Sequence, residues 1–365
     1  MNKMLPNLTA FSAGNEKPYE QMRDYFFHYM SAKNGKKYGD FDASVSLDVK
    51  EKKMHDALMS EIARVSGQPI REDMDMAHFS MNPMIKWASF AVIDAMIDAI
   101  LPETIIDSIG VYTDIRPVGF GDSASFRIEP RSLYTVSQGA NAQRTGFIHK
   151  QFATTKTMVA VNHTITVEVS LYAVLAGQED IGRFVRKAII SLETQMTLDA
   201  YNALNAGLTA ASVPAALTQS GYTQDGLLKL CNTVTAYNQG AKAVIVGTVS
   251  ALSNVLPNQA SGFRILTDSD AMNIQVIKNF FDYDVLVLPQ VATGAADYGL
   301  ALDDKKIYVV SPTSDKLIKG VVEGGTLTNS NDFYENANLT QNATLNKRWN
   351  FEWVSNATAG LVQLA

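Results

Sequence analysis

The stretch FGDSASFRIEPRSLYTVSQGANAQRTGFIHKQFATTKTMVAV, residues 120–161, decides the fold. Its two ends alternate apolar and polar residues as the arms of a β-hairpin do, whereas the middle, SQGANAQRTG at 137–146, holds nothing that could form a core. A two-stranded hairpin is marginally stable by itself in water, so this one needs a partner. The sequence therefore predicts an extended hairpin whose missing core is another subunit.

The hairpin is locally basic within a chain whose net charge is -6. The basic residues of its arms and tip are Arg127, Arg131, Arg144, Lys150 and Lys156. A solvated strand face would explain them, but a hairpin without an internal partner favours electrostatic matching to an acidic surface on another copy of the chain. The candidates for that acidic surface are Glu179, Asp180, Glu193 and Asp199. Gln138 at the tip is a further candidate contact between subunits.

The next two segments predict a long strand and a long helix. Between Val159 and Leu171, apolar residues and His163 alternate with polar ones, which indicates a strand with one wet face. In 179–206, apolar residues recur at steps of three and four, and Gly207 ends the pattern. At 1.5 Å per residue this helix would be about 40 Å long, so we expect it to act as a structural beam.

The segments before and after this region follow other patterns. Residues 1–80 hold one clear amphipathic helix, at 48–67, whose apolar stripe is too narrow to found a domain, so we expect an arm. A mostly buried helix at 84–101 ends before Pro102. From 208 to about 300, short apolar strands alternate with helices, one of them at 268–281, which favours an α/β unit. Strands then return to the C-terminus around a polar, Asn-rich interruption at 326–347.

Composition limits the classes of function. With 365 residues, 46% of them hydrophobic, the chain can form a substantial core, and its negative net charge disfavours tight duplex binding. The single cysteine, Cys231, lies at an apolar helical position and predicts a core residue of a protein from a reducing compartment. Residues 1–20 lack the apolar run of a signal peptide, so we expect the chain to stay in the cytoplasm where it is made. Charged residues interrupt 84–106, so this stretch does not predict a membrane span.

No motif for catalysis, cofactor binding or metal binding stands out. Gly119, Gly121 and Ala124 match the spacing of a dinucleotide fingerprint, but a strand rather than a helix follows them, so we interpret the glycines as turn residues. The histidines lie in separate segments without ligand spacing. Acidic residues in REDMDMAH and TDSDAM could hold a divalent cation, although a solvated face or a helix cap is the commoner role of such groups. We therefore expect a protein that is not an enzyme and needs no cofactor.

The order of these elements resembles that of the major capsid proteins of tailed bacteriophages, of the Hong Kong 97 type. The similarity lies in PETIIDSIGVYTDIRPVGFGDSASFRIEPRSLYTVSQGANAQRT, 102–145, and in VSLYAVLAGQEDIGRFVRKAIISLETQM, 169–196. It implies an α+β fold with an N-terminal arm at 1–80, an E-loop at 119–157, and a peripheral domain at 81–118 and 158–207 whose spine helix is 179–206. It also implies an axial domain at 208–317, a return through the peripheral domain at 318–353 and a last axial-domain strand at 354–365.

The resemblance implies that the chain works by self-assembly. We expect a major capsid protein that forms hexamers and pentamers, and through them the icosahedral head shell around the double-stranded DNA of a tailed phage. The implied partners are further copies of the chain, portal and scaffolding proteins, a decoration protein and weakly contacted DNA, with no membrane. We expect assembly in the host bacterial cytoplasm and a final location in the virion. The alternatives are an encapsulin-type compartment, an enzyme built on the α/β unit at 241–290 and an adhesive tail-fibre protein.

Overall fold

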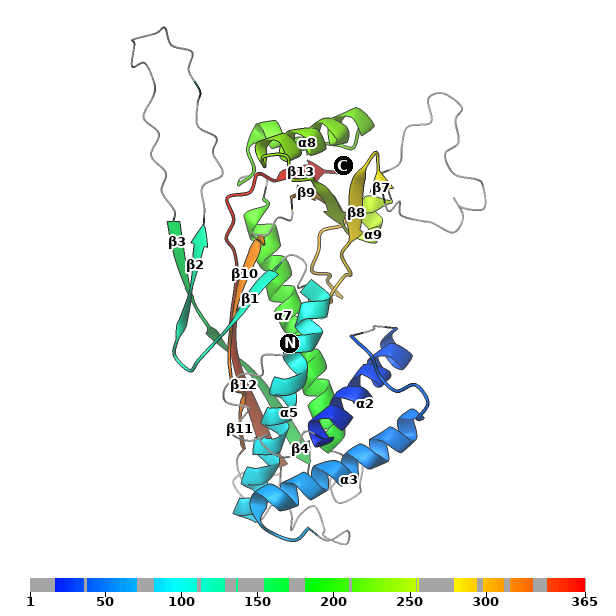
Figure 1. Cartoon of the computed structure of the whole chain (residues 1–365), viewed down its shortest axis with the longest axis vertical. Helices are drawn as coiled ribbons and strands as arrows, with labels where there is room; N and C mark the ends of the chain where they lie inside the picture. The colour runs from blue at the N-terminus through cyan, green and yellow to red at the C-terminus, as the bar shows by residue number, and fades with distance from the viewer. Residues whose placement is uncertain are drawn as a thin grey trace.

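A 27-residue helix, α7 (Ile181–Gly207), runs through the centre of the structure (Figure 1). Its buried face consists of residues at steps of three and four, among them Val185, Ile189, Leu192 and Met196. This is the pattern on which the helix at 179–206 was predicted, because a helix on a core buries one stripe of its side chains. Asp199 and Asn205 of α7 hydrogen-bond to residues of two different sheets, so α7 joins them as a beam.

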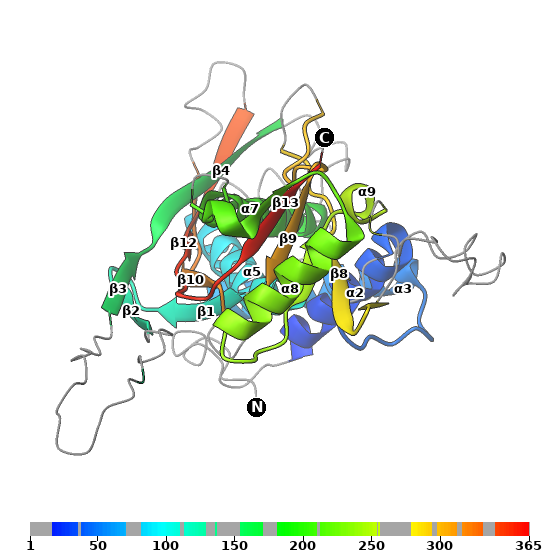
Figure 2. The same ribbon diagram turned by 90° about the horizontal axis from the view of Figure 1, so that it is seen from above.

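The computed structural model describes residues 17–35, 38–70, 82–109, 113–128, 136, 154–170, 181–209, 212–253, 255, 279–293, 298–311, 316–330 and 340–364. Within these ranges the strands form a five-stranded, a six-stranded and a two-stranded sheet, with helices packed against the two larger ones (Figures 1 and 2). The expected α+β class is confirmed.

The five-stranded sheet lies along α7. Its order is β1 (Thr113–Val118), β10 (Ile318–Glu323), β12 (Thr340–Trp353) and β11 (Leu327–Ser330), with β4 (Val161–Ser170) also paired to β12. β1 runs parallel to β10, and the other pairs are antiparallel. Leu345, Lys347, Trp349 and Phe351 of β12 are buried, whereas Asn346, Arg348 and Asn350 between them are only partly covered. The sheet thus has a dry face against α7 and a wet outer face.

β11 at 327–330 and the first half of β12 at 340–347 lie where the sequence predicted a polar interruption, and 331–339 lies outside the described residues. That prediction is wrong because polar residues suit both faces of the sheet at this place. On the outer face, Thr166 and Thr344 lie opposite each other and their hydroxyl oxygens are 3.2 Å apart. On the inner face, Lys347 is buried beside an acidic partner, Asp98. Cross-strand polar pairs of this kind stabilise a sheet as apolar ones do.

The single strand predicted at 159–171 is divided at Ala160. Before the division, β3 (Thr154–Val159) pairs with β2 (Ser123–Ile128), and after it β4 pairs with β12. The change of partner shifts the alternation by one residue, so that Met158 and Ala160 are buried. Val159 and Val161, predicted for the dry face, are instead 53% and 54% exposed. Side chains alternate between two faces only within one ladder, so the buried set can shift by one residue where the chain leaves one ladder and enters another.

Helix α5 (Pro83–Ile109) continues through Pro102, where the sequence predicted its end. Proline removes one backbone donor and costs a helix interior about 3 kcal/mol. The residues on both sides of Pro102 outweigh this cost, because Leu101 before it and Thr104 after it are almost fully buried. The Thr104 hydroxyl also donates to the Leu101 carbonyl, 2.9 Å away.

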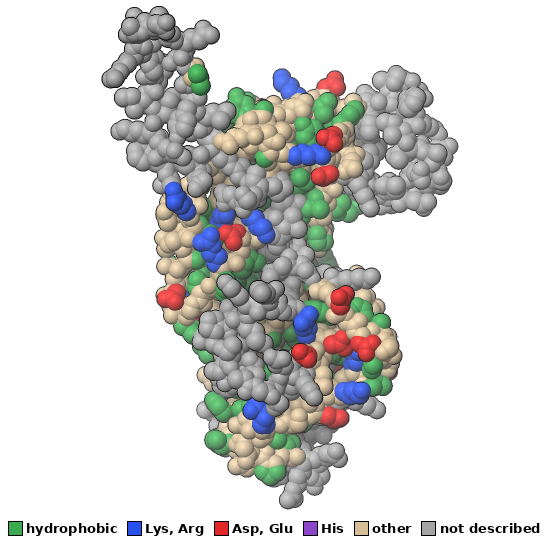
Figure 3. Space-filling model, viewed as in Figure 1, with side chains coloured by type: hydrophobic (Ala, Val, Ile, Leu, Met, Phe, Trp, Pro, Cys, Tyr) green, Lys and Arg blue, Asp and Glu red, His purple; other side chains and the backbone are tan. Residues whose placement is uncertain are grey.

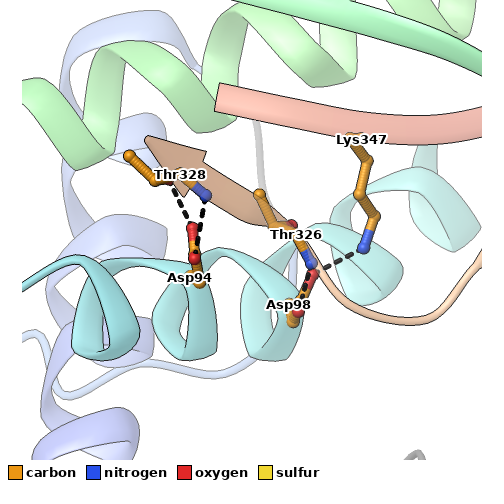
Figure 4. A network of polar contacts seen from close by, with 5 residues as sticks. All are labelled: Asp94, Asp98, Thr326, Thr328 and Lys347. Atoms are coloured by element: carbon orange, nitrogen blue, oxygen red, sulfur yellow. Dashed lines mark hydrogen bonds and ion pairs between the residues drawn. The ribbon is translucent and has the colours of Figure 1, made fainter. Parts of the chain in front are cut away.

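A buried polar network fastens α5 to the five-stranded sheet (Figure 4). The Asp98 carboxylate accepts hydrogen bonds from the backbone N–H and the hydroxyl of Thr326 and lies 2.5 Å from the Lys347 ammonium. One turn earlier, the Asp94 carboxylate accepts the same two bonds from Thr328. Asp94 and Asp98 are the residues that interrupt the apolar run of 84–106, and the structure shows that they bind the sheet.

The N-terminal segment contains a helix that the sequence analysis missed. Helix α2 (Lys17–Asn34) packs against α3 (Leu47–Ser66) and α5, and its Met22, Tyr25, Phe26 and Met30 are buried. α3 is the amphipathic helix predicted at 48–67, and it ends at a left-handed Gly67, φ 66°. The described part of 1–80 is therefore a helical pair folded onto its own chain, at the lower right in Figure 1.

The six-stranded sheet lies at the C-terminal end of α7. Its order is β5 (Thr218–Ser220), β13 (Gly360–Gln363), β9 (Lys306–Val310), β6 (Val244–Gly247), β8 (Tyr283–Val287) and β7 (Asn279–Phe280). Helix α8 (Gln224–Tyr237), capped by Thr223, and the short α9 (Val249–Leu252) cover it, as the α/β pattern predicted. The end of the helix predicted at 268–281 is instead strand β7, and the rest of it lies outside the described residues.

Candidate subunit interface

The described base of the hairpin, β2 and β3, packs on its own chain. Phe126 of β2 and Met158 of β3 are each 1% exposed, and they form an apolar cluster with Val321 of β10 and with Val354. Burying a side chain of this size contributes about 2–3 kcal/mol. The expectation that the hairpin has no internal core is therefore wrong for its base, and most of the rest of the hairpin lies outside the described residues.

Arg116 of β1 covers the edge of this cluster. Its guanidinium carbon lies 4.3 Å from the centre of the Phe126 ring, and its Nη1 donates to the Ser125 carbonyl, 2.8 Å away. Asp114 lies 3.4 Å from the same guanidinium. A cation over an aromatic face is attracted by the ring quadrupole, so Arg116 holds β2 against the edge of the larger sheet.

The elbow between β1 and β2 is a tight turn, as the two glycines predicted. The Asp122 N–H donates to the Gly119 carbonyl, 3.1 Å away, and Gly121 has φ 77°, a conformation that favours glycine. Phe120 at this turn is 53% exposed, as are Val159 and Val161 on the neighbouring stretch of chain. The sequence analysis missed these three as surface residues, since alternation placed both valines inside.

Two of the six hairpin candidates lie in the described base. Arg127 is exposed and has no ion pair among the described residues, so it stays available to another subunit. Lys156 has an internal partner, because its ammonium lies 2.8 Å from the Glu352 carboxylate of β12. In Figure 3 several Lys and Arg side chains lie close together at the left of the molecule, on the side of this base, and others are scattered over the same face. The other candidates, Arg131, Gln138, Arg144 and Lys150, lie outside the described residues, as does the tip at 137–146.

Glu193 on α7 cannot serve as an exposed acidic contact. It is 2% exposed and accepts a hydrogen bond from the Tyr38 hydroxyl of the α2–α3 pair. A carboxylate enclosed by its own subunit cannot reach a neighbour's guanidinium, so the assignment of Glu193 to the interface is corrected. Helical periodicity alone could not reveal this, since the covering element lies far earlier in the chain.

Asp199 on α7 also acts within its own subunit. Its carboxylate accepts hydrogen bonds from the Trp349 indole N–H, 2.8 Å away, and from the Gln195 amide, 2.9 Å away. His163 stacks on the Trp349 ring at 3.8 Å and lies 3.5 Å from Asp199. These contacts lock α7 to β4 and β12, so Asp199 has partners within its own subunit, and its role as an interface residue stays a prediction. Glu179 and Asp180 lie outside the described residues.

The described residues contain no arrangement suited to metal or thiol chemistry. Among them, no three His, Cys, Asp or Glu side chains converge as metal ligands would. Burial raises the pKa of the Cys231 thiol to about 12, so the reactive thiolate is scarce at neutral pH. In the same ranges, none of the helices has both the length and the apolar character that crossing a bilayer requires.

Comparison with protein families gives a match over most of the chain. The model described as "SPbeta prophage-derived putative capsid protein YonB" matches residues 48–363, which is most of the chain. The matched region contains α3, α5, the hairpin, α7 and both larger sheets. No curated protein matches the sequence.

Several solved structures resemble the fold of this chain at low sequence identity. The capsid of a native GTA particle is 11% identical, with a TM-score of 0.48, covering 72% of this chain and 90% of that one. The capsid of cyanophage P-SCSP1u is 11% identical, TM-score 0.47, covering 70% and 86%. The mature capsid of bacteriophage PhiM1 is 11% identical, TM-score 0.43, covering 70% and 86%. At these identities and TM-scores, the similarity supports no conclusion about this chain.

Proposed function

Because the chain belongs to the YonB family of prophage-derived capsid proteins, we propose that it is a major capsid protein that assembles into the head shell of a tailed phage. The family match over 48–363 is the observation that carries this proposal. Hexamers and pentamers of the chain would form an icosahedral shell around double-stranded DNA. Each contact in such a shell can be modest, because a closed lattice sums many of them.

Family membership settles the class of the protein. The chain is a structural protein of a phage shell and works by association with further copies of itself, so the prediction that it is not an enzyme is confirmed. The same match does not favour an encapsulin compartment, an enzyme on the unit at 241–290 or a tail-fibre adhesin.

The hairpin supports a role in contacts between subunits. Figures 1 and 2 both show β2 and β3 at one side of the molecule, standing out from the two larger sheets. The base is fixed by its own apolar cluster, and the residues that join its two strands include the tip SQGANAQRTG at 137–146. Because the tip holds nothing that could form a core, the hairpin would gain stability when a neighbouring subunit covers it. Arg127 and the basic residues beyond it would meet an acidic surface of that neighbour.

The two larger sheets support the expected division into domains. The five-stranded sheet with α5 and α7 would be the peripheral domain, and the six-stranded sheet with α8 the axial domain. The strands β10 and β12 would return the chain through the peripheral domain at 318–353, and β13 would close the axial sheet. This arrangement is the one that the Hong Kong 97 resemblance implied.

Other partners follow from the proposal. A head shell needs a portal and, during assembly, a scaffolding protein, and its outside can carry a decoration protein. The net charge of -6 suits a container that contacts its DNA weakly, because strong binding to the wall would hinder packing and release. Assembly would take place in the cytoplasm of the host bacterium.

Shortening the hairpin tests the proposal. Replacing 137–146 by a two-residue Asn-Gly turn should give a soluble subunit that retains its helical circular dichroism but forms no particles in sedimentation and negative-stain microscopy. A control replaces the same ten residues by Gly and Ser at full length, which separates the effect of reach from that of side-chain chemistry. Particles of normal size from the shortened variant would contradict the role given to the hairpin.

A further inference from the structure

The chain changes its pairing partner within one residue at the root of the hairpin. β4 and β12 pair from Ser170 opposite Thr340 to Val161 opposite Trp349. At Val159 the chain is already paired with Ser123 of β2, while β12 remains paired with β10 as far as Trp353. Ala160 lies between the two ladders and belongs to neither strand. The direction in which the hairpin leaves the sheet is therefore set at this residue.

A row of three alternate residues on β12, Arg348, Asn350 and Glu352, holds the departing strand. Arg348 Nη2 donates to the Ala160 carbonyl at 3.0 Å, and Asn350 Nδ2 donates to the Val159 carbonyl at 3.2 Å. The Glu352 carboxylate lies 2.8 Å from the ammonium of Lys156. Residues at steps of two share one face of a strand, so from the outer face of the sheet the row contacts Ala160 and then two residues of β3.

Arg348 is fixed from its other side by Glu323. Its Nη1 lies 2.8 Å from Glu323 Oε2, and the Glu323 side chain is only 2% exposed at the end of β10. The hydrogen bond to Ala160 orients the planar guanidinium, and the ion pair with Glu323, whose Oε2 has no hydrogen-bond partner among the described residues, holds its position. Arg348 thus ties the root of the hairpin to β10, a strand with which neither β2 nor β3 pairs.

We propose that this row sets the direction of the hairpin before assembly, with Arg348 as the positioning residue. The apolar cluster around Phe126 holds the base but has no preferred direction, whereas the hydrogen bonds from Arg348 and Asn350 do. Direction matters because β3 has six residues, about 20 Å of strand, so a change of about 10° at Ala160 displaces its far end by about 3 Å. The importance for shell formation rests on the proposed function, but the positioning itself can be measured on unassembled subunits.

The test compares Arg348→Lys with the wild-type chain. Lysine keeps the positive charge beside Glu323 but cannot bind that carboxylate and the Ala160 carbonyl in one plane. Spin labels at Thr155→Cys on β3 and Ser191→Cys on α7, both exposed, report the hairpin's position by pulsed electron paramagnetic resonance. Measurement uses dilute full-length chains mixed with unlabelled protein, so only distances within a subunit contribute.

We expect a narrow distance distribution for wild type and, for Arg348→Lys, a shift or broadening of about 3 Å. The matched control is Arg64→Lys on α3, where the arginine also binds a buried glutamate, Glu61, at 2.5 Å, and where the distribution should not change. If Arg348→Lys fails to fold, Asn350→Ala with the same labels replaces it, because it leaves no buried charge unpaired. An unchanged distribution in the folded variant would overturn the positioning role.

Particle formation separates this inference from the proposed function. Arg348→Lys subunits should assemble into irregular or unclosed particles under conditions in which wild type forms closed shells. A wild-type chain that forms no particles would contradict the proposed function and leave the distance measurement valid. Closed shells from Arg348→Lys, together with an unchanged distance distribution, would contradict the positioning role alone.

Discussion

Lys347 and Asp98 form an ion pair inside the core, with the ammonium nitrogen 2.5 Å from Asp98 Oδ1 and the two side chains 3% and 7% exposed. Neither charge could be buried alone, since a lone ion loses its hydration without compensation. The pair, with its hydrogen bonds from Thr326, joins β12 and the start of β11 to α5. It therefore fixes how the sheet that carries the hairpin sits on its helices.

Removing the lysine charge should destabilise the subunit strongly. Lys347→Met leaves Asp98 buried without its cation, and we expect a loss of about 3–5 kcal/mol in the free energy of unfolding by urea. Lys306→Met is the control, because its partner Asp303 lies 3.2 Å away in a pair that is 28% and 43% exposed. Exposed pairs contribute less than about 1 kcal/mol. Equal effects of the two substitutions would contradict the structural role of the buried pair.

Asp94 should make the stability of the subunit depend on pH. Burial raises the pKa of its carboxyl from 3.8 to about 6, against the hydrogen bonds from Thr328, which lower it. Between pH 3.8 and about 6, the folded state therefore keeps the Asp94 carboxyl protonated while the unfolded chain has released this proton. The stability gained from protonated Asp94 is complete below pH 3.8 and is lost as the pH rises through about 6. Asp94→Asn cannot titrate.

Urea unfolding of Asp94→Asn and wild type at several pH values measures this contribution. The stability of the variant relative to wild type should increase between pH 4 and 7 by up to about 3 kcal/mol. Asp56→Asn on the exposed side of α3 controls for the loss of one negative charge. Parallel curves for wild type and Asp94→Asn would show that Asp94 does not titrate in this range.

Gly320 should tolerate no side chain. A Cβ at this position in β10 would lie 2.5 Å from the Phe351 ring and 3.4 Å from Ile115. Overpacking of this kind costs about 1–3 kcal/mol, so Gly320→Ala should lower the thermal midpoint. Gly324→Ala is the control four residues later, where the added carbon meets only the Val118 carbonyl at 3.5 Å. A lower thermal midpoint for both variants would point to effects of the backbone rather than to crowding of the added carbon.

Phe126 should hold the hairpin base without holding the rest of the subunit. Phe126→Ala removes the largest side chain of the base cluster, so we expect faster amide hydrogen exchange in β2 and β3 while α7 keeps its protection. Phe120→Ala, at the half-exposed elbow, should change the exchange of β2 and β3 much less. Loss of protection throughout the subunit would show that the base is part of the global core.

Local patterns carried the correct sequence predictions. Helix α7 and the arms of the hairpin follow from the spacing of their apolar residues, and α3 from its stripe and Gly67. Helix α2 had a readable signal as well, because Met22, Tyr25, Phe26 and Met30 recur at helical steps.

The incorrect sequence predictions concern contacts between segments that are distant in the sequence. The cover over Phe126 comes from Val321 and Val354, and the burial of Glu193 from Tyr38, none of which is near in sequence. Pro102 stays in its helix because tertiary packing outweighs local propensity. For the candidate interface, alternation did offer a clue: Arg348, Asn350 and Glu352 alternate with three aromatic residues in RWNFEW, a strand with one wet face.

Cryo-electron microscopy of the purified chain tests the central claim most directly. The account predicts closed icosahedral shells in which the hairpin of each subunit leaves β12 at Ala160 and extends over a neighbouring subunit. Folded monomers or small open oligomers under all assembly conditions would contradict it, as would shells in which the hairpin contacts only its own subunit.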